Sequence, residues 1–126
     1  MKRFIVSLVI LGIVLGISLG GARFVTSTYE QIDQNLSKSL KFMDKGEYKE
    51  AKRLCAEAEK IYSKREHFLA AFVNHGILDE IGESVSSVAP LADKESIPEF
   101  KSSCSQAKTA LRHMRNDHVF ILGNLF

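Results

Sequence analysis

Residues 4–22 read FIVSLVILGIVLGISLGGA, a run of 19 residues in which no side chain is charged. As an α-helix this apolar stretch would be about 28 Å long, close to the thickness of the hydrocarbon layer of a membrane. A helix that is apolar on every side does not suit a small soluble domain. The sequence therefore predicts that residues 1–23 form a single transmembrane anchor, in contact with the lipid bilayer through residues 4–22.

The apolar stretch also has an alternative interpretation as a cleaved secretion signal. Gly20 and Ala22 are small residues of the kind that precede a cleavage site, and cleavage would release a secreted protein. The stretch is longer than the apolar region of a usual signal peptide, which favours an uncleaved signal-anchor. Lys2 and Arg3 precede it, whereas Arg23 is the only basic residue close behind it. The positive-inside rule then predicts a cytoplasmic N-terminus and an extracytoplasmic C-terminal domain.

The remaining residues, 24–126, show the periodicity of α-helices and no strand-like alternation. Apolar side chains recur every three or four positions in three segments, residues 25–43, 48–72 and 97–114. Asp44-Lys45-Gly46 should end the first helix, because glycine suits the left-handed cap. Ser96 and Glu99 have the spacing of a capping box at the start of the last helix, and Pro98 fits its first turn.

The middle of the chain requires a break. A helix from Glu47 to Val88 would be about 60 Å long and would reach back into the membrane. We expect the second helix to turn near Ser63–His67, with Gly76 as the alternative position, and a further helix to run to about Val88. The predicted fold is all-α: a transmembrane helix followed by an antiparallel three- to four-helix bundle over residues 24–126.

Charge excludes some classes of function. The chain has 126 residues, with 17 Lys and Arg against 15 Asp and Glu. Three basic residues flank the apolar stretch, so residues 24–126 carry 14 basic and 15 acidic side chains. Without a clustered basic face, nucleic acid is not an expected partner. No nucleophile-elbow or phosphate-loop motif occurs in the bundle, so we expect neither enzymatic activity nor a cofactor.

Two histidine–aspartate pairs are candidate metal ligands. His75 and Asp79 are four residues apart, as are His113 and Asp117, so each pair shares a helix face. On facing helices the two pairs could bind a metal ion through imidazole and carboxylate groups. The other interpretation is a hydrogen bond within each pair that fixes a helix end. The first interpretation leads to a metal-binding or small-ligand sensor.

Cys55 and Cys104 both fall on the apolar faces of predicted helices, at similar distances from the same end of the bundle. An oxidising location would permit a disulfide between them. The second and fourth helices of a square bundle are diagonal, however, and their Cα atoms would then exceed the limit of about 7 Å. Two buried thiols that act as small apolar residues are the alternative.

The C-terminal segment is unusually apolar for a chain end. If the last helix returns toward the bilayer, this segment and residues 68–73 arrive near the membrane surface. Both segments either close the bundle core or form an interaction patch. The candidate patch residues at the chain end are Phe120, Ile121, Leu122, Leu125 and Phe126.

Several short motifs together resemble a known family. The basic N-terminus and single apolar helix are followed by Gly46-Glu47-Tyr48-Lys49-Glu50-Ala51, Phe72-Val73-Asn74-His75, Leu78-Asp79-Glu80-Ile81, Leu111 with His113, and Asn124-Leu125-Phe126. The chain is similar to the domain-of-unknown-function 4363 family, small membrane-anchored proteins of Gram-positive bacteria. Tyr48 stands where the family usually has tryptophan. The resemblance implies a helical extracytoplasmic domain and supplies no biochemical activity.

The sequence thus favours a structural or protein-interaction module of the cell envelope, which would bind another envelope protein or itself. The alternative is a metal-binding or small-ligand sensor bundle that uses His75, Asp79, His113 and Asp117.

Overall fold

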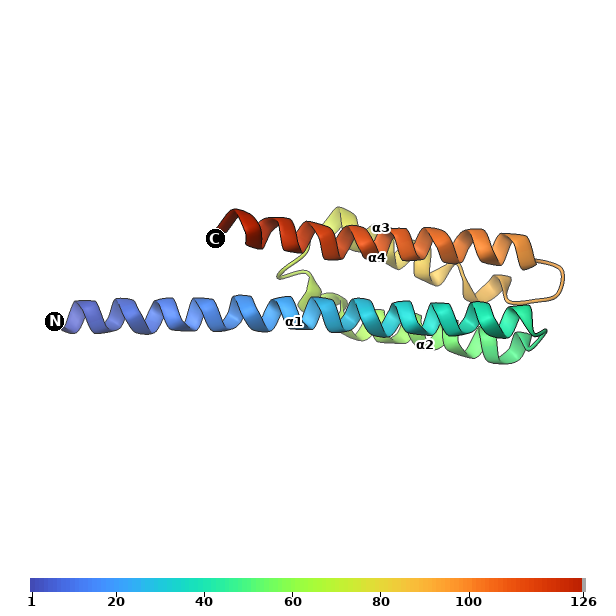
Figure 1. Cartoon of the computed structure of the whole chain (residues 1–126), viewed down its shortest axis with the longest axis horizontal. Helices are drawn as coiled ribbons and strands as arrows, with labels where there is room; N and C mark the ends of the chain where they lie inside the picture. The colour runs from blue at the N-terminus through green and yellow to red at the C-terminus, as the bar shows by residue number, and fades with distance from the viewer. Residues whose placement is uncertain (126) are drawn as a thin grey trace.

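The computed structural model describes the backbone of residues 1–125 and the side chains of residues 1–116. These residues contain no strand and confirm the all-α class. The elements are α1 (Lys2–Asp44), α2 (Tyr48–Leu69), α3 (His75–Ser86), the short 3₁₀ helix η1 (Ala89–Leu91) and α4 (Ile97–Leu125) (Figure 1).

The first helix, α1, is continuous from the apolar stretch into the bundle (Figure 1). Residues 1–20 project from the bundle, and none of them is buried. From Gly21 onward one face is buried, at Gly21, Val25, Thr28, Ile32, Leu36, Ser39 and Met43. The N-terminal part of α1 is long and apolar enough to cross a membrane. One helix therefore joins a potential membrane span to the packed domain.

The turn between α1 and α2 forms as the sequence predicts. Gly46 has a φ of 77°, the left-handed conformation that glycine adopts without strain. The Glu47 N–H donates to the Phe42 carbonyl at 2.8 Å, and the Gly46 N–H donates to the Met43 carbonyl at 3.1 Å. These two hydrogen bonds form a Schellman motif, which satisfies carbonyls at the end of α1. We call this end of the bundle the distal end.

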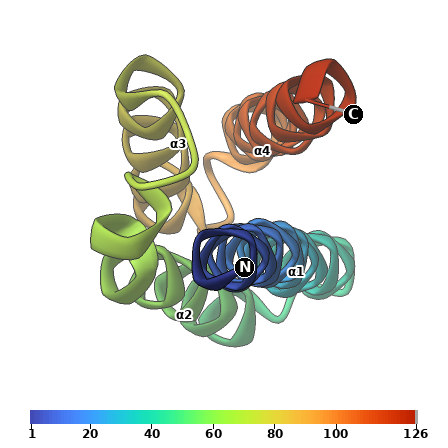
Figure 2. The same cartoon turned by 90° about the vertical axis from the view of Figure 1, so that its left-hand side faces the viewer.

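The four helices lie at the corners of a square. α1 packs against α2 and α4, and α3 packs against the same two helices. The end-on view shows the four helices around the bundle axis, with α2 and α4 diagonal to each other as predicted (Figure 2). Three small residues on α2, Ala51, Cys55 and Ala58, are fully buried and allow a close approach to α1. Larger side chains of all four helices complete the core, including Ile32, Leu36, Leu69, Ile81, Phe100, Leu111 and Met114.

The predicted turn near Ser63–His67 is wrong by a few residues. α2 continues to Leu69, whose side chain is fully buried, and the chain reverses over residues 70–74. Asn74 then caps α3, because its side-chain oxygen accepts a hydrogen bond of 2.7 Å from the Gly76 N–H. α2 extends this far because buried packing on α1 begins as early as Gly21. We call this end, which lies beside the end of the apolar stretch, the proximal end.

The last helix begins where the sequence predicts. α4 starts at Ile97, directly after Ser96, and the Phe100 N–H donates to the Ser96 carbonyl at 2.8 Å. Pro98 lies in the first turn, where its missing N–H costs no helical hydrogen bond. α3 ends at Ser86, close to the predicted Val88.

Candidate functional site

Polar contacts between α4 and α1 fix the relative height of the two helices. Lys101 Nζ lies 3.2 Å from Asp44 Oδ1, and Lys108 Nζ lies 3.7 Å from Asp33 Oδ1. Lys108 also donates a hydrogen bond to the Ser37 hydroxyl. Lys101 and Lys108 are seven residues apart, as are Asp44 and Ser37. The two antiparallel helices therefore stay in register from one contact to the next.

Arg115 of α4 and Arg65 of α2 make further contacts with α1, closer to the proximal end. The Arg115 guanidinium lies 4.9 Å from the centre of the Tyr29 ring, and Arg65 lies 5.7 Å from the centre of the Phe24 ring. Such stacking on aromatic faces is attractive and leaves the guanidinium donors available to other partners. Arg65 uses its donors for side-chain oxygens of α1, at 3.1 Å from each of Thr28 and Gln31.

Three phenylalanines, Phe24, Phe68 and Phe72, lie at the proximal end and form what we call the proximal aromatic cluster. The rings of Phe24 and Phe68 meet edge to face, with their centres 6.5 Å apart. Phe72 packs on Gly21, where an added Cβ would lie only 2.5 Å from the ring. Phe68 is 64% exposed, whereas its neighbour Leu69 is fully buried. The predicted apolar segment 68–73 thus contributes both to the core and to the surface.

The other half of the predicted patch lies on the last turns of α4. The backbone at Phe120, Ile121, Leu122 and Leu125 is helical and continues α4. The side chains of these residues, and all of Phe126, lie outside the described residues. The patch at the chain end therefore stays a prediction.

Of the proposed metal quartet, His113 has a charged partner in the structure, and that partner is a residue from outside the quartet. His113 Nδ1 lies 3.6 Å from Glu80 Oε1 of α3, a carboxylate that the sequence hypothesis did not include. His75 is the first residue of α3, and Asp79 lies one turn later on the same helix. The side chain of Asp117 lies outside the described residues. Among the described side chains, no group of three or more His, Cys, Asp or Glu residues could hold a metal ion.

Cys55 and Cys104 are free, fully buried thiols. Cys104 Sγ lies 3.7 Å from the Leu36 carbonyl oxygen, toward which it donates. Burial raises the pKa of Cys104 to about 12, and the nearby Cys55 contributes to the rise. Burial also raises the pKa of Cys55, although a contact with Ser39 partly offsets it. Thiols held in the protonated form are poor nucleophiles, so the pair suits the core better than catalysis.

A groove between α2 and α3 carries several carboxylates. It has a volume of about 430 Å³ and is lined by residues that include Glu59, Glu66, Asp79 and Glu83. The hydroxyl of the buried Tyr62, which also lines the groove, donates to the Leu78 carbonyl and ties α2 to α3. Burial, with the charges of Glu66 and Asp79, raises the pKa of Tyr62.

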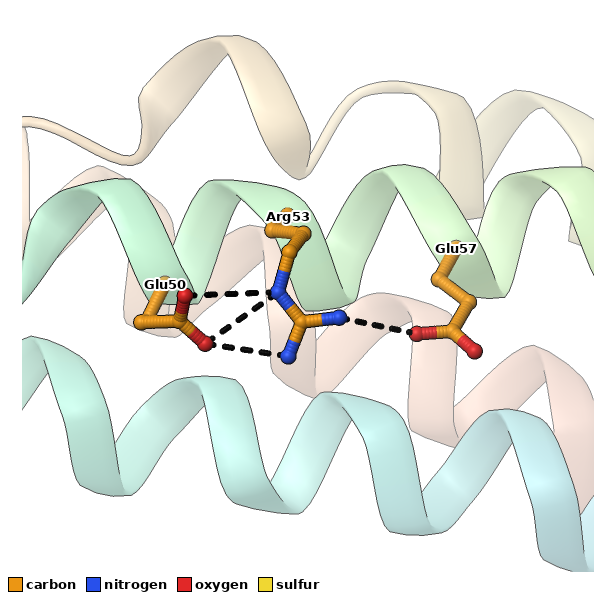
Figure 3. A network of polar contacts seen from close by, with 3 residues as sticks. All are labelled: Glu50, Arg53 and Glu57. Carbon is orange, nitrogen blue, oxygen red and sulfur yellow. Dashed lines mark hydrogen bonds and ion pairs between the residues drawn. The ribbon is translucent and has the colours of Figure 1, made fainter.

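The outer face of α2 is charged and solvated. Arg53 lies between two carboxylates on this face, with Nη2 2.9 Å from Glu50 Oε2 and Nη1 3.5 Å from Glu57 Oε2 (Figure 3). All three side chains are about half exposed. Exposed pairs of this kind contribute little to stability, so the row suits a solvated surface better than a reactive site.

The residues that set the height of the helices were not predicted from the sequence. The seven-residue spacing of Lys101, Lys108 and Arg115 is visible there, but their partners on α1 are not. Asn74 before a helical segment is a recognisable capping signal. Gly21 inside an apolar stretch gives no sign that an aromatic ring from a distant turn packs on it.

A protein-family model described as a domain of unknown function, DUF4363, matches residues 20–125. The match covers the whole bundle and begins one residue before the first buried position of α1. Neither a curated protein nor a solved structure matches the chain. Since the matched segment is most of the sequence, the chain belongs to the DUF4363 family.

Proposed function

We propose that this chain is a single-pass membrane protein of the cell envelope, whose bundle acts outside the membrane as a structural and protein-interaction module. Residues 4–22 would span the bilayer, with the N-terminus in the cytoplasm. The observation that carries the proposal is the continuity of α1, which is one helix from the apolar stretch to the distal turn. This continuity supports a bundle that is held rigidly on the membrane span, because no flexible linker separates the two.

The geometry of α1 favours a spacer role. Residues 22–44 rise about 33 Å at the helical repeat, so the distal end would stand at a fixed height above the membrane. Packing of α2 and α4 along the same part of α1 resists its bending. A partner bound at the distal end would therefore be held at a defined distance from the bilayer.

The distal end offers a surface for such a partner. A shallow groove of about 480 Å³ lies between η1 and the start of α4. Leu91 and Pro98 make part of it apolar, and serine and glutamine side chains beside them add hydrogen-bonding groups. Mixed apolar and polar surfaces are typical of protein–protein contacts. We propose that another envelope protein binds here, with self-association as the alternative outcome.

The topology can be tested with cysteine labelling, because both native cysteines are buried. A Lys94→Cys variant places an exposed thiol in the α3–α4 connection, and a Lys2→Cys variant places one before the apolar stretch. We expect a membrane-impermeant maleimide to label the first variant in intact cells and the second only after lysis. The reverse pattern would refute the orientation, and a labelled protein found in the medium would indicate cleavage.

The interaction can be tested by photo-crosslinking in native membranes. A benzoylphenylalanine in place of Pro98 probes the distal groove, and one in place of Glu57 on the charged face of α2 serves as the matched control. We expect discrete adducts from the first position and none from the second. Adducts that contain only this chain would show self-association. If neither position gives an adduct, the interaction role is wrong.

A further inference from the structure

The proximal end carries an exposed aromatic ring that the core does not explain. Among the described side chains, the large apolar residues that are strongly exposed lie within residues 1–19, with Phe68 as the exception. One exposed ring is ordinary on a protein surface. Phe68 is not isolated, however, because it belongs to the proximal aromatic cluster with Phe24 and Phe72.

The height of this cluster follows from α1. Phe72 packs on Gly21, which lies inside the apolar stretch, and Phe24 is two residues beyond its end. Two residues of helix correspond to about 3 Å, whereas the headgroup layer on each side of a bilayer is about 5–7 Å thick. If residues 4–22 span the hydrocarbon layer, the cluster lies at the boundary between hydrocarbon and headgroups.

The backbone of α4 reaches the same height. Its contacts with α1 advance by one heptad at a time, from Lys101 beside Asp44 to Lys108 beside Ser37. Two heptads beyond Lys108, the same register places residue 122 beside residues 22–23 of α1. Figure 1 shows α4 extending farther along α1 toward the N-terminus than the α2–α3 turn does. The apolar sequence at residues 119–122 therefore lies level with the end of the apolar stretch.

Two arginines lie next to the aromatic cluster, on its side facing away from the apolar stretch. Arg65 stacks on Phe24 and donates to Thr28 and Gln31, which places its guanidinium about two helical turns beyond the end of the apolar stretch. Arg115 stacks on Tyr29 at a similar height. Guanidinium groups suit phosphate oxygens, and aromatic rings are enriched at the interface of the membrane with water. Along α1 the apolar helix, the aromatic rings and the arginines follow one another in the same order as the hydrocarbon, the interface and the phosphate groups of one leaflet.

We propose that the proximal end of the bundle is seated in the bilayer surface, with Phe68 and the α2–α3 turn at the boundary between hydrocarbon and headgroups. The partner of this surface is a phospholipid leaflet, not a second protein. This seating rests on the proposed membrane span of residues 4–22 and goes beyond it. A span alone would allow the bundle to stand clear of the lipid.

The absence of tryptophan from the chain allows single-tryptophan reporters. Three full-length variants, Phe68→Trp, Tyr48→Trp at the distal end and Leu11→Trp in the apolar stretch, are reconstituted in phosphatidylcholine–phosphatidylglycerol vesicles. Phospholipids brominated near the headgroup end of their chains then quench tryptophans at the acyl boundary, and phospholipids brominated near the methyl end quench tryptophans close to the midplane, such as that of Leu11→Trp. We expect the Phe68→Trp reporter to emit at shorter wavelength than the Tyr48→Trp reporter. We also expect its quenching to be at least about two-fold stronger, as for a side chain at the acyl boundary.

The three reporters separate the two proposals. A quenched Leu11→Trp reporter with equal, weak quenching at positions 68 and 48 would overturn the seating while leaving the span intact. An unquenched Leu11→Trp reporter would refute the span itself. Blue-shifted but unquenched emission from the Phe68→Trp reporter would show that protein, not lipid, covers it. An Ala71→Trp variant in the exposed α2–α3 turn repeats the measurement without altering Phe68, and circular dichroism checks that each variant is helical.

Discussion

The contact of Lys108 with Asp33 gives a sharp test of how α4 is held on α1. The side chains of Lys108 and Asp33 are 26% and 31% exposed, whereas those of Lys101 and Asp44 are 53% and 63% exposed. We call Lys108 with Asp33 the inner pair and Lys101 with Asp44 the outer pair. The distance between nitrogen and oxygen is longer in the inner pair, at 3.7 Å against 3.2 Å. If burial decides the strength, the inner pair is the stronger of the two. If the distance between the charged atoms decides the strength, the outer pair is the stronger of the two.

We expect burial to decide, because water screens the exposed pair far more effectively. The coupling free energy between Asp33→Asn and Lys108→Met should be about 1 kcal/mol, against at most about 0.3 kcal/mol between Asp44→Asn and Lys101→Met. Methionine keeps most of the apolar stem of lysine, so the comparison removes charge with little change in packing. Each double-mutant cycle also cancels the loss of other contacts, such as that of Lys108 with Ser37.

Thermal unfolding of the full-length chain in detergent micelles, followed by circular dichroism, measures both cycles. A loss of about 1 kcal/mol lowers the Tm of a domain of this size by roughly 4–8 °C. Added salt should reduce the coupling of the outer pair proportionally more than that of the inner pair. Equal coupling in the two cycles, or stronger coupling of the outer pair, would refute the argument that burial sets the strength of these contacts.

The turns and the core give further predictions. Gly46→Ala should destabilise the bundle by about 1 kcal/mol, because the left-handed φ strains a residue with a Cβ, and Gly46→Asn should restore part of the loss in thermal unfolding. Tyr62→Phe should lower the free energy of unfolding by about 1 kcal/mol, because the buried hydroxyl no longer donates to the Leu78 carbonyl. A loss no larger than that caused by Tyr48→Phe would contradict this role. Cys55 and Cys104 should resist maleimide labelling until the chain unfolds, and an intact mass two protons short would instead reveal a disulfide. Because the pKa of Cys104 is raised to about 12, its thiol stays protonated in the native state while the unfolded thiol ionises near pH 9. The unfolded state then binds fewer protons, so stability falls by about 1 kcal/mol between about pH 9 and 10, and Cys104→Ala should flatten this fall in urea titrations at each pH.

Local signals explain the parts of the fold that the sequence predicts well. The apolar stretch, the helical periodicity and the turn at Gly46 depend on consecutive residues, whose properties can be read without knowing their neighbours in space. The diagonal placement of Cys55 and Cys104 also follows, because four helices with short connections pack in chain order around a square. The candidate metal quartet is different, since its members lie on two helices whose relative height no local pattern reveals.

The sequence by itself therefore determines that this protein is an apolar helix continued into a helical bundle. Only the tertiary structure decides how far α2 extends, that Phe72 packs on Gly21, and that His113 meets Glu80. The physical reason is that the period of a helix fixes which face is buried but leaves the helix free to slide along its axis. Side-chain packing and cross-helix contacts such as that of Lys108 with Asp33 remove this freedom, and they place the aromatic cluster level with the end of the apolar stretch.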